Sequence, residues 1–289
     1  MANTIALVTK FLAILDELYK KESLTASMDS PTKPVEFGGA AAVNVLKLST
    51  VGLGTYSRAT GYPAGDVTAA WETLTLAASR GRALSVDRMD DEETLGMAFG
   101  KLAGEFMRVN VAPEIDAYRF SKFASWSNIS SPSEAALADA AAVVAALRVA
   151  TNTMDEDEVP EEGRKLFITP TLLGYVADQD TTKSKEVLAR FSEIIKVPQT
   201  RFYKGITLNA GATASAGGFT KTASTGRDLN FMVIHPTAVL QAVKHENTKY
   251  FSPEVNQTAD AHLMQYRIYH DAFVYENHVD GVYAHVKNS

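Results

Sequence analysis

Carboxylates and histidines are the side chains in this sequence that could carry acid–base or metal chemistry. One group of carboxylates is close enough in sequence to supply an acid–base pair, and it consists of Asp87, Asp90, Asp91, Glu92 and Glu93. Helix capping explains the same spacing, because Asp90 stands three residues before Glu93 and acidic side chains are favoured in a first helical turn. We therefore favour a helix start over a catalytic pair.

The six histidines lack the spacing of a metal site, since none stands in an HExxH motif or in a close ligand pair. They are His235, His245, His262, His270, His278 and His285. His235 precedes Pro236 and is predicted to cap a helix, and the others fit strand or loop positions. The chain also has no cysteine and no GxSxG motif. We predict no catalytic residue, no cofactor and no metal site.

Two stretches of biased composition resemble ligand loops without having their spacing. The acidic run at residues 155–162 lacks the alternating ligands and central glycine of a calcium loop, so it is expected to be a solvated loop. The Gly/Ala/Thr-rich stretch at residues 211–227 lacks the spacing of a phosphate-binding loop. Its length makes it a functional or flexible connection.

Composition bounds the class of protein. The 289 residues are 46% hydrophobic and 21% charged, which is ordinary for a soluble globular chain of one large or two smaller domains. The net charge of -6 does not predict a basic nucleic-acid-binding face, although it is compatible with enclosing nucleic acid. No apolar run has the length of a membrane span, and the first residues lack the pattern of a secretory signal. We expect the chain to be intracellular when made.

The first half of the chain is predicted to consist of extended segments around one long helix. Thr4–Tyr19 has the pattern of an amphipathic helix, and Thr25–Gly39 reads as an extended arm that docks on its own domain or reaches a neighbour. Val45–Ser57 and Val67–Val86 are predicted to form a long hairpin around a Gly/Pro-rich turn. Such a hairpin is marginal alone in water, so it lies on its own domain or on a neighbouring subunit.

One long helix is predicted over Asp90–Asn110, with an apolar stripe at spacings of three and four. Pro113 ends or kinks it, and also fits the first position of a second helix that runs to Ser125. Ser131 to Glu134 carry a serine cap, a proline and a glutamate, which predict a further helix to about Thr151.

The second half reads as an α/β unit followed by long strands. Lys165–Thr169 and Asn230–His235 are short apolar strands, each followed by Pro-Thr and a helical pattern, to about Ala177 and Lys244 respectively. This shared plan predicts two neighbouring strands in one sheet, covered by helices. A helix is expected over Ser184–Ile195. Further extended segments are expected at Tyr203–Asn209, Lys249–Asn256, Ala261–Tyr275 and Gly281–Val286.

The order of these elements resembles the major capsid protein family of tailed bacteriophages, which has the Hong-Kong-type capsid fold. Five stretches carry the resemblance: residues 52–62 (GLGTYSRATGY), 67–94, 110–125, 231–245 (FMVIHPTAVLQAVKH) and 265–285. They extend from the arm to the C-terminal strands. The fold that this implies is α+β, with an N-terminal arm, an extended hairpin loop, a peripheral domain with a long spine helix, and an α/β axial domain.

The resemblance implies a domain division and a set of contacts. Residues 1–48 would be the arm, 49–86 the extended loop, 87–131 with 250–279 the peripheral domain, and 132–249 with 280–289 the axial domain. Copies would form hexamers and pentamers of an icosahedral head that encloses double-stranded DNA without sequence-specific binding. The residues expected at contacts between subunits are Arg58, Tyr62, Trp71, Arg80 and Arg82. We expect the three arginines to pair with acidic groups of a neighbour.

Other features implied by the resemblance concern assembly. Some relatives join an extended-loop lysine to an asparagine, but Ser49–Arg82 contains no lysine, so no such bond is predicted. A portal protein and a separate scaffold are the expected partners, with assembly in the host cytoplasm and the virion as the final location. Two alternatives stay open. One is an encapsulin-like bacterial compartment with the same fold, and the other is a soluble α/β enzyme with an unfamiliar site.

Overall fold

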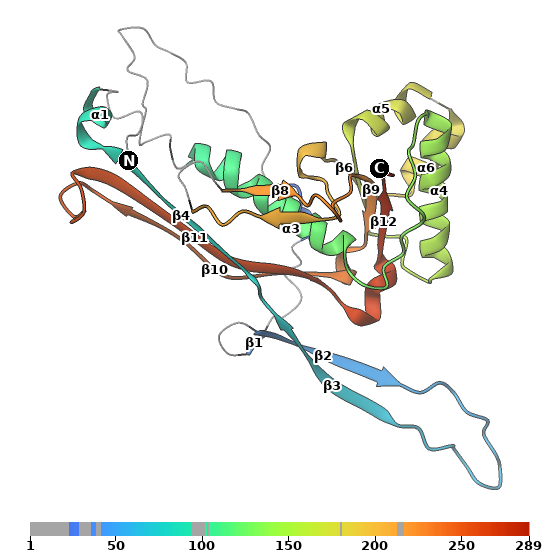
Figure 1. Ribbon diagram of the computed structural model, residues 1–289. Helices are drawn as coiled ribbons and strands as arrows, with labels where there is room; N and C mark the ends of the chain where they lie inside the picture. The colour runs from blue at the N-terminus through green and yellow to red at the C-terminus, as the bar shows by residue number, and fades with distance from the viewer. Residues whose placement is uncertain are drawn as a thin grey trace.

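The computed structural model describes residues 23–28, 36–38, 42–93, 102, 104–179, 181–212 and 217–288. Figure 1 shows three parts: a long sheet with a helix lying along it, an α/β unit at one end of that helix, and a hairpin that projects away from both. The helix expected over Thr4–Tyr19 and much of the one expected over Asp90–Asn110 lie outside the described residues. None of the helices in the described part combines the length and hydropathy of a membrane-spanning segment.

The α/β unit is built on a four-stranded sheet with the order β12-β9-β5-β6. These strands are β12 (Val282–Val286), β9 (Leu229–Ile234), β5 (Lys165–Ile168) and β6 (Glu193–Lys196). β9 is antiparallel to β12 and β5, whereas β5 and β6 are parallel. All six residues of β9 are buried, as expected for a strand with both faces covered. The predicted pairing of the two short apolar strands is therefore confirmed.

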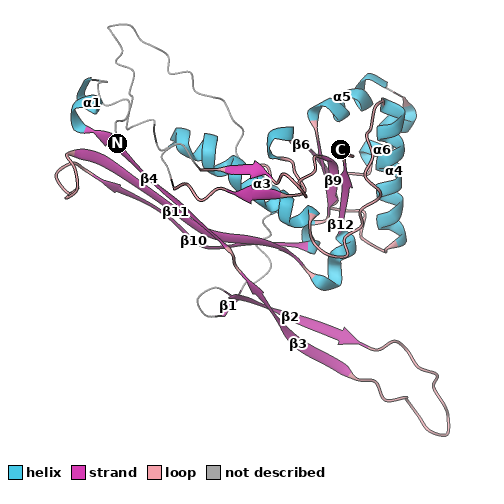
Figure 2. Ribbon diagram, in the orientation of Figure 1, coloured by secondary structure: helices cyan, strands magenta, loops and turns pink. Residues whose placement is uncertain are grey.

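Helices cover both faces of this sheet. α4 (Ala140–Glu156), α5 (Pro170–Gln179) and α6 (Thr182–Ala189) form one layer, and Figure 2 shows them gathered at this end of the molecule. Their core includes Leu147, Val176 and Phe231. α3 (Ala112–Ala124) covers the other face, where Phe120 lies between Phe167 and Phe202 at ring distances of 5.2 and 5.0 Å. The unit is thus a three-layer α/β/α sandwich.

The long sheet is antiparallel and has the order β10-β11-β4. It consists of β10 (Val239–Phe251), β11 (Ala261–Val274) and β4 (Ala78–Asp87). Alternate residues of β11, including Met264, Tyr266 and Ile268, pack against Val111 at the start of α3. α3 therefore touches both sheets and holds them in one body (Figure 1).

The central helix differs from the prediction in its boundaries. α1 (Arg88–Glu93) follows β4, and a second helical stretch runs unbroken from residue 104 to Ala124. Its middle, η2 (Met107–Val111), is π-helical, and the N–H of Ala112 bonds to the carbonyl of Met107. The wider turn accommodates Pro113, which lacks an N–H and would clash with a regular preceding turn. Pro113 neither ends nor separates two helices.

The projecting hairpin is shorter than predicted, because the segment Val67–Val86 belongs to two strands. β2 (Ala42–Thr50) pairs with β3 (Val67–Thr75), and the short β1 (Glu36–Gly38) pairs with β2. The chain then leaves the hairpin, and β4 pairs with β11 in the long sheet. The N–H of Ala77 donates to the buried Asp271 carboxylate at 2.8 Å, which fixes this change of sheet.

Three helix predictions in the second half are wrong in part. Residues 131–139 are not helical, and α4 begins after Asp139, whose carboxylate caps Ala142. Only η4 (Pro236–Ala238) follows β9, and Val239 onward is the strand β10. α6 ends at Ala189, so residues 193–195 belong to β6. Each of these segments is held by pairing with a strand that is distant in sequence.

The remaining described elements are short. β7 (Ile206–Leu208) and β8 (Phe219–Lys221) form a small hairpin beside α3. Short 3-10 helices are found at η1 (Ala26–Met28), η3 (Gln199–Arg201) and η5 (Glu276–Gly281), and η5 is kinked at His278. The expected strands at Ala261–Tyr275 and Gly281–Val286 are confirmed by β11 and β12. Ser23–Met28, from the predicted arm, docks on its own chain, with Met28 2% exposed in the main core.

Candidate functional site

The hairpin of β2 and β3 exposes an apolar face. Leu46 lies directly opposite Trp71 in the strand register, so their side chains point to the same face. Leu46 is 47% exposed, Trp71 62% and Val67, at the far end of the same face, 70%. Large apolar side chains gathered on a projecting element mark an interaction surface, because a monomeric soluble protein rarely exposes them together.

The far end of the hairpin is an ordered turn that displays an arginine. Ser57 and Gly61 exchange backbone hydrogen bonds at 3.2 and 2.8 Å, and the Ser57 hydroxyl accepts the N–H of Ala59. Gly61 has a φ of +79°, which glycine adopts without strain. The rings of Tyr56 and Tyr62 pack 5.0 Å apart across this turn. Arg58 is thus held exposed between two tyrosines, the side-chain types that dominate protein–protein binding energy.

The base of the hairpin is fixed to the body of the subunit. Val43 and Leu74 are buried there with Leu240 and Phe273. On the opposite face from Trp71, Lys47 pairs with Glu276 of η5 at 2.5 Å. The hairpin is therefore anchored at one end and projects away from the body (Figure 1). Its apolar side chains Leu46, Val67 and Trp71 are exposed.

The five predicted contact residues fall on two different elements. Arg58, Tyr62 and Trp71 lie on the hairpin, whereas Arg80 and Arg82 lie on β4 in the long sheet. Arg82 Nη1 donates to the carbonyl of Gly211 at 3.3 Å. Arg80 has an acidic partner within its own chain, Glu114, so its side chain is already occupied in the subunit.

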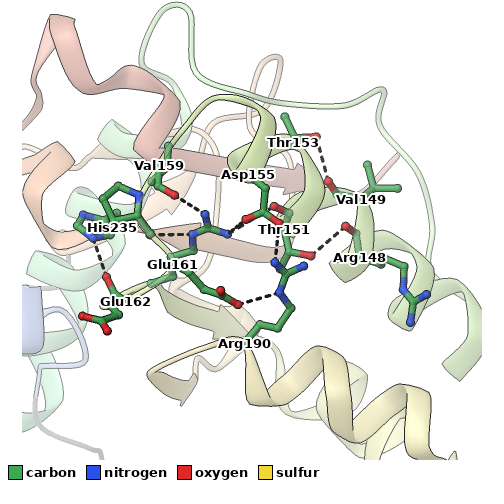
Figure 3. Close-up of polar contacts among 12 residues, drawn as sticks. Arg148, Val149, Thr151, Thr153, Asp155, Val159, Glu161, Glu162, Arg190 and His235 are labelled. Carbon is green, nitrogen blue, oxygen red and sulfur yellow. Dashed lines mark hydrogen bonds and ion pairs between the residues drawn. The ribbon is translucent and has the colours of Figure 1, made fainter.

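The acidic run at residues 155–162 has exposed carboxylates, as predicted, but its first two residues belong to the end of α4 and two of its carboxylates are paired. Asp155 belongs to the end of α4, and its carboxylate bonds Arg164 at 2.7 Å and Arg190 at 2.5 Å. Arg190 also bonds Glu161 at 2.9 Å. Figure 3 shows how these side chains converge from α4, from the segment before β5 and from the end of α6.

Arg164 is the centre of this network and was not recognised in the sequence. It is 1% exposed and also donates to the carbonyls of Val159 and Pro160. Burial alone would raise the pKa of Asp155, but the hydrogen bonds from Arg164 and Arg190 outweigh it and lower that pKa. The signal in the sequence was an arginine at the entry to an apolar strand, beside a run of acids. The network is structural: it fixes the path of the chain between α4 and β5.

His235 ties the same loop to β9. Its Nε2 lies 2.9 Å from the carbonyl of Glu162 and must donate, because a carbonyl only accepts. Its Nδ1 then accepts the N–H of Thr237, which caps η4 as predicted. These bonds fix the orientation of the His235 ring and have a structural role.

A second cluster of buried titratable groups lies between α3 and β11. The Tyr118 hydroxyl donates to Asp271 at 3.0 Å, and burial together with this carboxylate raises the pKa of Tyr118. The Tyr118 ring packs edge-on against His270 at 5.2 Å. Asp271 also accepts the backbone N–H of Ala77, so this cluster helps to fix the position of the chain between β3 and β4. Across the described residues, no group of three or more acidic or histidine side chains is placed to hold a metal ion.

Asp116 is a further residue that the sequence analysis missed. It is 0% exposed on α3 and bonds Arg201 and the backbone of the N-terminal segment. Its only sequence signal is its spacing from Phe120 and Phe123, which places a carboxylate on the apolar stripe of the helix.

Solved structures of phage capsids share this architecture over almost the whole chain. A structure of Mycobacterium phage Che8 is 13% identical with a TM-score of 0.63, covering 99% of this chain and 98% of that one. The capsid of cyanophage P-SCSP1u is 11% identical with a TM-score of 0.66, covering 98% and 94%. A virus-like particle from Pyrococcus furiosus is 10% identical with a TM-score of 0.52, covering 87% and 89%. The sequence matches no protein-family model and no curated protein.

The fold therefore defines the class: this is an α+β chain with the phage capsid fold. That part of the sequence prediction is confirmed by the likeness to the two phage structures. At identities of 10–13% the likeness concerns the fold alone.

Proposed function

We propose that this chain is the major capsid protein of a tailed phage, which assembles into the hexamers and pentamers of an icosahedral head around double-stranded DNA. The observation that carries the proposal is a capsid fold over nearly the whole chain together with an exposed apolar hairpin. A fold shared with capsids supports a structural, non-enzymatic role, and the buried carboxylates Asp116 and Asp271 bond to groups that hold the fold together.

The hairpin supplies a means of joining copies. Specific interfaces bury roughly 1,200–2,000 Å² in total, and a projecting element adds contact area that the body of the subunit does not supply. We assign Arg58, Tyr62 and Trp71 to the contact with a neighbouring copy. For Arg80 and Arg82 a contact with a neighbour stays a prediction, alongside the contacts that they make within the chain.

The remaining parts of the proposal concern domains and partners. The division into arm, extended loop, peripheral domain and axial domain is retained with its boundaries as a prediction. A net charge of -6 suits a wall that encloses DNA without binding it tightly. A portal protein and a separate scaffold are the proposed partners, and assembly is proposed to occur in the host cytoplasm before the head becomes part of the virion.

A second candidate is a compartment shell of the encapsulin type, which would enclose an enzyme. The likeness to the virus-like particle from Pyrococcus furiosus favours this candidate. Its TM-score of 0.52 is lower than the 0.63 and 0.66 of the two phage structures, so the phage reading is preferred. The contents of shells purified from the native host would separate them, because one predicts DNA and the other predicts protein.

Negative-stain microscopy of the purified chain, combined with light scattering, tests the proposal. Hollow shells, or rings of five and six copies, are the expected result, with a co-expressed scaffold if the chain alone stays small. A uniform monomer or dimer under every assembly condition, with and without scaffold, would contradict both shell readings. Turnover of a small substrate by such an oligomer would favour the enzyme alternative.

A further inference from the structure

Asp116 is a buried carboxylate in which five hydrogen bonds converge. Its Oδ1 accepts the Ser23 hydroxyl at 2.8 Å, the Thr25 hydroxyl at 2.9 Å and the Thr25 N–H at 3.3 Å. Its Oδ2 accepts the Leu24 N–H at 3.0 Å and Arg201 Nη1 at 2.9 Å. Four of these donors belong to three consecutive residues of the N-terminal segment.

These bonds join three parts of the chain that are far apart in sequence: Ser23–Thr25, the helix α3 and the turn η3 (Gln199–Arg201). Neighbouring side chains hold the same segment. Arg119 donates to the Thr25 hydroxyl at 2.8 Å, and Gln241 donates to the Thr25 carbonyl at 3.2 Å. Met28 then inserts into the main core. The segment is thus fixed to the body along its whole described length.

The geometry selects one path for the chain. The N–H groups of Leu24 and Thr25 both bond the Asp116 carboxylate, which fixes the position and direction of Ser23–Thr25 on α3. Bonds to an ionised acceptor are about twice as strong as bonds between neutral groups. Asp116 therefore sets the point on α3 from which residues 1–22 continue.

We propose that Asp116 is a positioning residue for assembly, which sets the exit point of the N-terminal arm and ties it to α3 and η3. The proposal rests on the proposed function, because in a shell the exit point decides which neighbouring copy the arm can reach. A competing explanation is that Asp116 only neutralises Arg201, whose side chain is 5% exposed.

Two variants separate these explanations. Asp116→Asn keeps the size of the side chain and removes its charge, leaving Arg201 uncompensated. The double variant Asp116→Leu with Arg201→Met removes both charges, a change that is often neutral or stabilising for a buried pair. If Asp116 only neutralises Arg201, the double variant keeps Ser23–Thr25 docked. If Asp116 positions the segment, the double variant folds but leaves these residues undocked.

Hydrogen exchange on the full, unassembled chain gives the first readout. We expect the Leu24 and Thr25 amides to exchange about 10- to 100-fold faster in both variants, because each loses a bond to a charged acceptor. Ser121→Ala is the matched control, since it removes one α3 hydrogen bond, to the Lys204 carbonyl, without touching the segment. Unchanged protection of Leu24 and Thr25 in the double variant would overturn the proposal.

Assembly gives the second readout. Asp116 variants that still fold, as judged by a cooperative unfolding transition, are expected to give open or irregular shells. Ser121→Ala is expected to give closed shells. Closed shells of normal diameter and yield from the double variant would also overturn the proposal. If the unchanged protein forms no shells at all, the proposed function fails, and the exchange rates still decide whether Asp116 holds the segment.

Discussion

Arg80 and Glu114 form a two-point ion pair between β4 and α3, with Nε 2.5 Å from Oε1 and Nη2 3.2 Å from Oε2. The same guanidinium donates to the carbonyls of Asn209 and Gly218 at 2.8 and 3.2 Å. One side chain therefore joins the long sheet, the central helix and the β7–β8 hairpin. The two side chains are only 22% and 16% exposed, so water screens the pair weakly.

Arg80→Glu is predicted to destabilise the isolated subunit, because it places a second carboxylate beside Glu114 and removes the arginine bonds to the carbonyls of Asn209 and Gly218. The expected loss is about 1–3 kcal/mol in the free energy of unfolding, measured by denaturant titration. Arg58→Glu is the matched control at the exposed hairpin tip, where the unfolding midpoint should not move. Equal midpoints for Arg80→Glu and the unchanged protein would show that the pair contributes nothing within the subunit.

Trp71→Ser is predicted to block assembly without destabilising the subunit. Trp71 is 62% exposed in the subunit, so the substitution should change the free energy of unfolding little. A buried aromatic side chain at an interface often contributes roughly 2 kcal/mol or more to the free energy of binding. The yield of closed shells is counted by microscopy, and the unfolding midpoint is measured in parallel. Ala70→Ser, on the opposite face of the same strand, is the control. Normal shells from Trp71→Ser would exclude this face from the contact.

Subunit stability is predicted to fall as the pH drops from about 6.5 to 4, in part because of His270. Burial, with a smaller contribution from Arg119 and Arg80 against an opposing one from Asp271, lowers the pKa of His270 to about 4. Between these values the unfolded chain binds a proton that the folded chain does not, so the folded state loses up to about 3 kcal/mol by pH 4. Above pH 6.5 this effect is absent.

The check is the melting temperature of His270→Gln as a function of pH. This variant cannot take up the proton, so its melting temperature should fall less steeply between pH 6.5 and 4 than that of the unchanged protein. His245→Gln, at an exposed position of β10, is the control for the loss of a histidine. If the melting temperature of His270→Gln falls with pH as steeply as that of the unchanged protein, the acid sensitivity is due to other groups.

Arg164→Met is predicted to release the loop between α4 and β5. The substitution removes the donor for the carbonyls of Val159 and Pro160 and one partner of Asp155. The expected cost is about 3 kcal/mol, together with faster hydrogen exchange over residues 156–163. Arg148→Met, exposed on α4, should change stability by about 0.5 kcal/mol at most. Equal effects of the two substitutions would refute a central role for Arg164.

Parts of the α/β unit and of the long sheet could be predicted because their signals are local. In the α/β unit, the apolar run of β5 is followed by Pro170 at a helix start. In the long sheet, β11 is a long run of aromatic and branched residues. The same reasoning failed after β9, where Pro236 starts only a single 3-10 turn. Leu240 and Ala242 are buried against Phe273 at the base of the hairpin, so pairing of β10 with β11 overrides the local helix signal.

Long-range bonds also explain the other failures. Residues 131–134 carry strong helix-start signals, yet the N–H of Ala135 donates to the Val286 carbonyl and Asn230 donates to the Ala135 carbonyl. The segment is thereby held against the end of β12. Of the predicted contact residues, Arg58, Tyr62 and Trp71 lie on the projecting hairpin, as the turn signals around them indicate. The sequence did not show that Arg80 lies in the long sheet and not on the hairpin. The break between β3 and β4 depends on the bond from Ala77 to Asp271, which is almost 200 residues away in sequence.

The ion pair between Lys47 and Glu276 at the base of the hairpin has a mechanical consequence. Both side chains are exposed, at 34% and 61%, so the pair resists bending by no more than about 1 kcal/mol. The pair therefore resists a tilt of the hairpin about its buried base at Val43 only weakly. The strand β2 extends about 23 Å beyond Val43, so a tilt of about 10° there moves the far end of the strand by about 4 Å without breaking the β2–β3 ladder. If the chain forms the proposed shell, a stiff hairpin on a flexible base lets identical copies make the same contact in flat facets and in sharply curved corners.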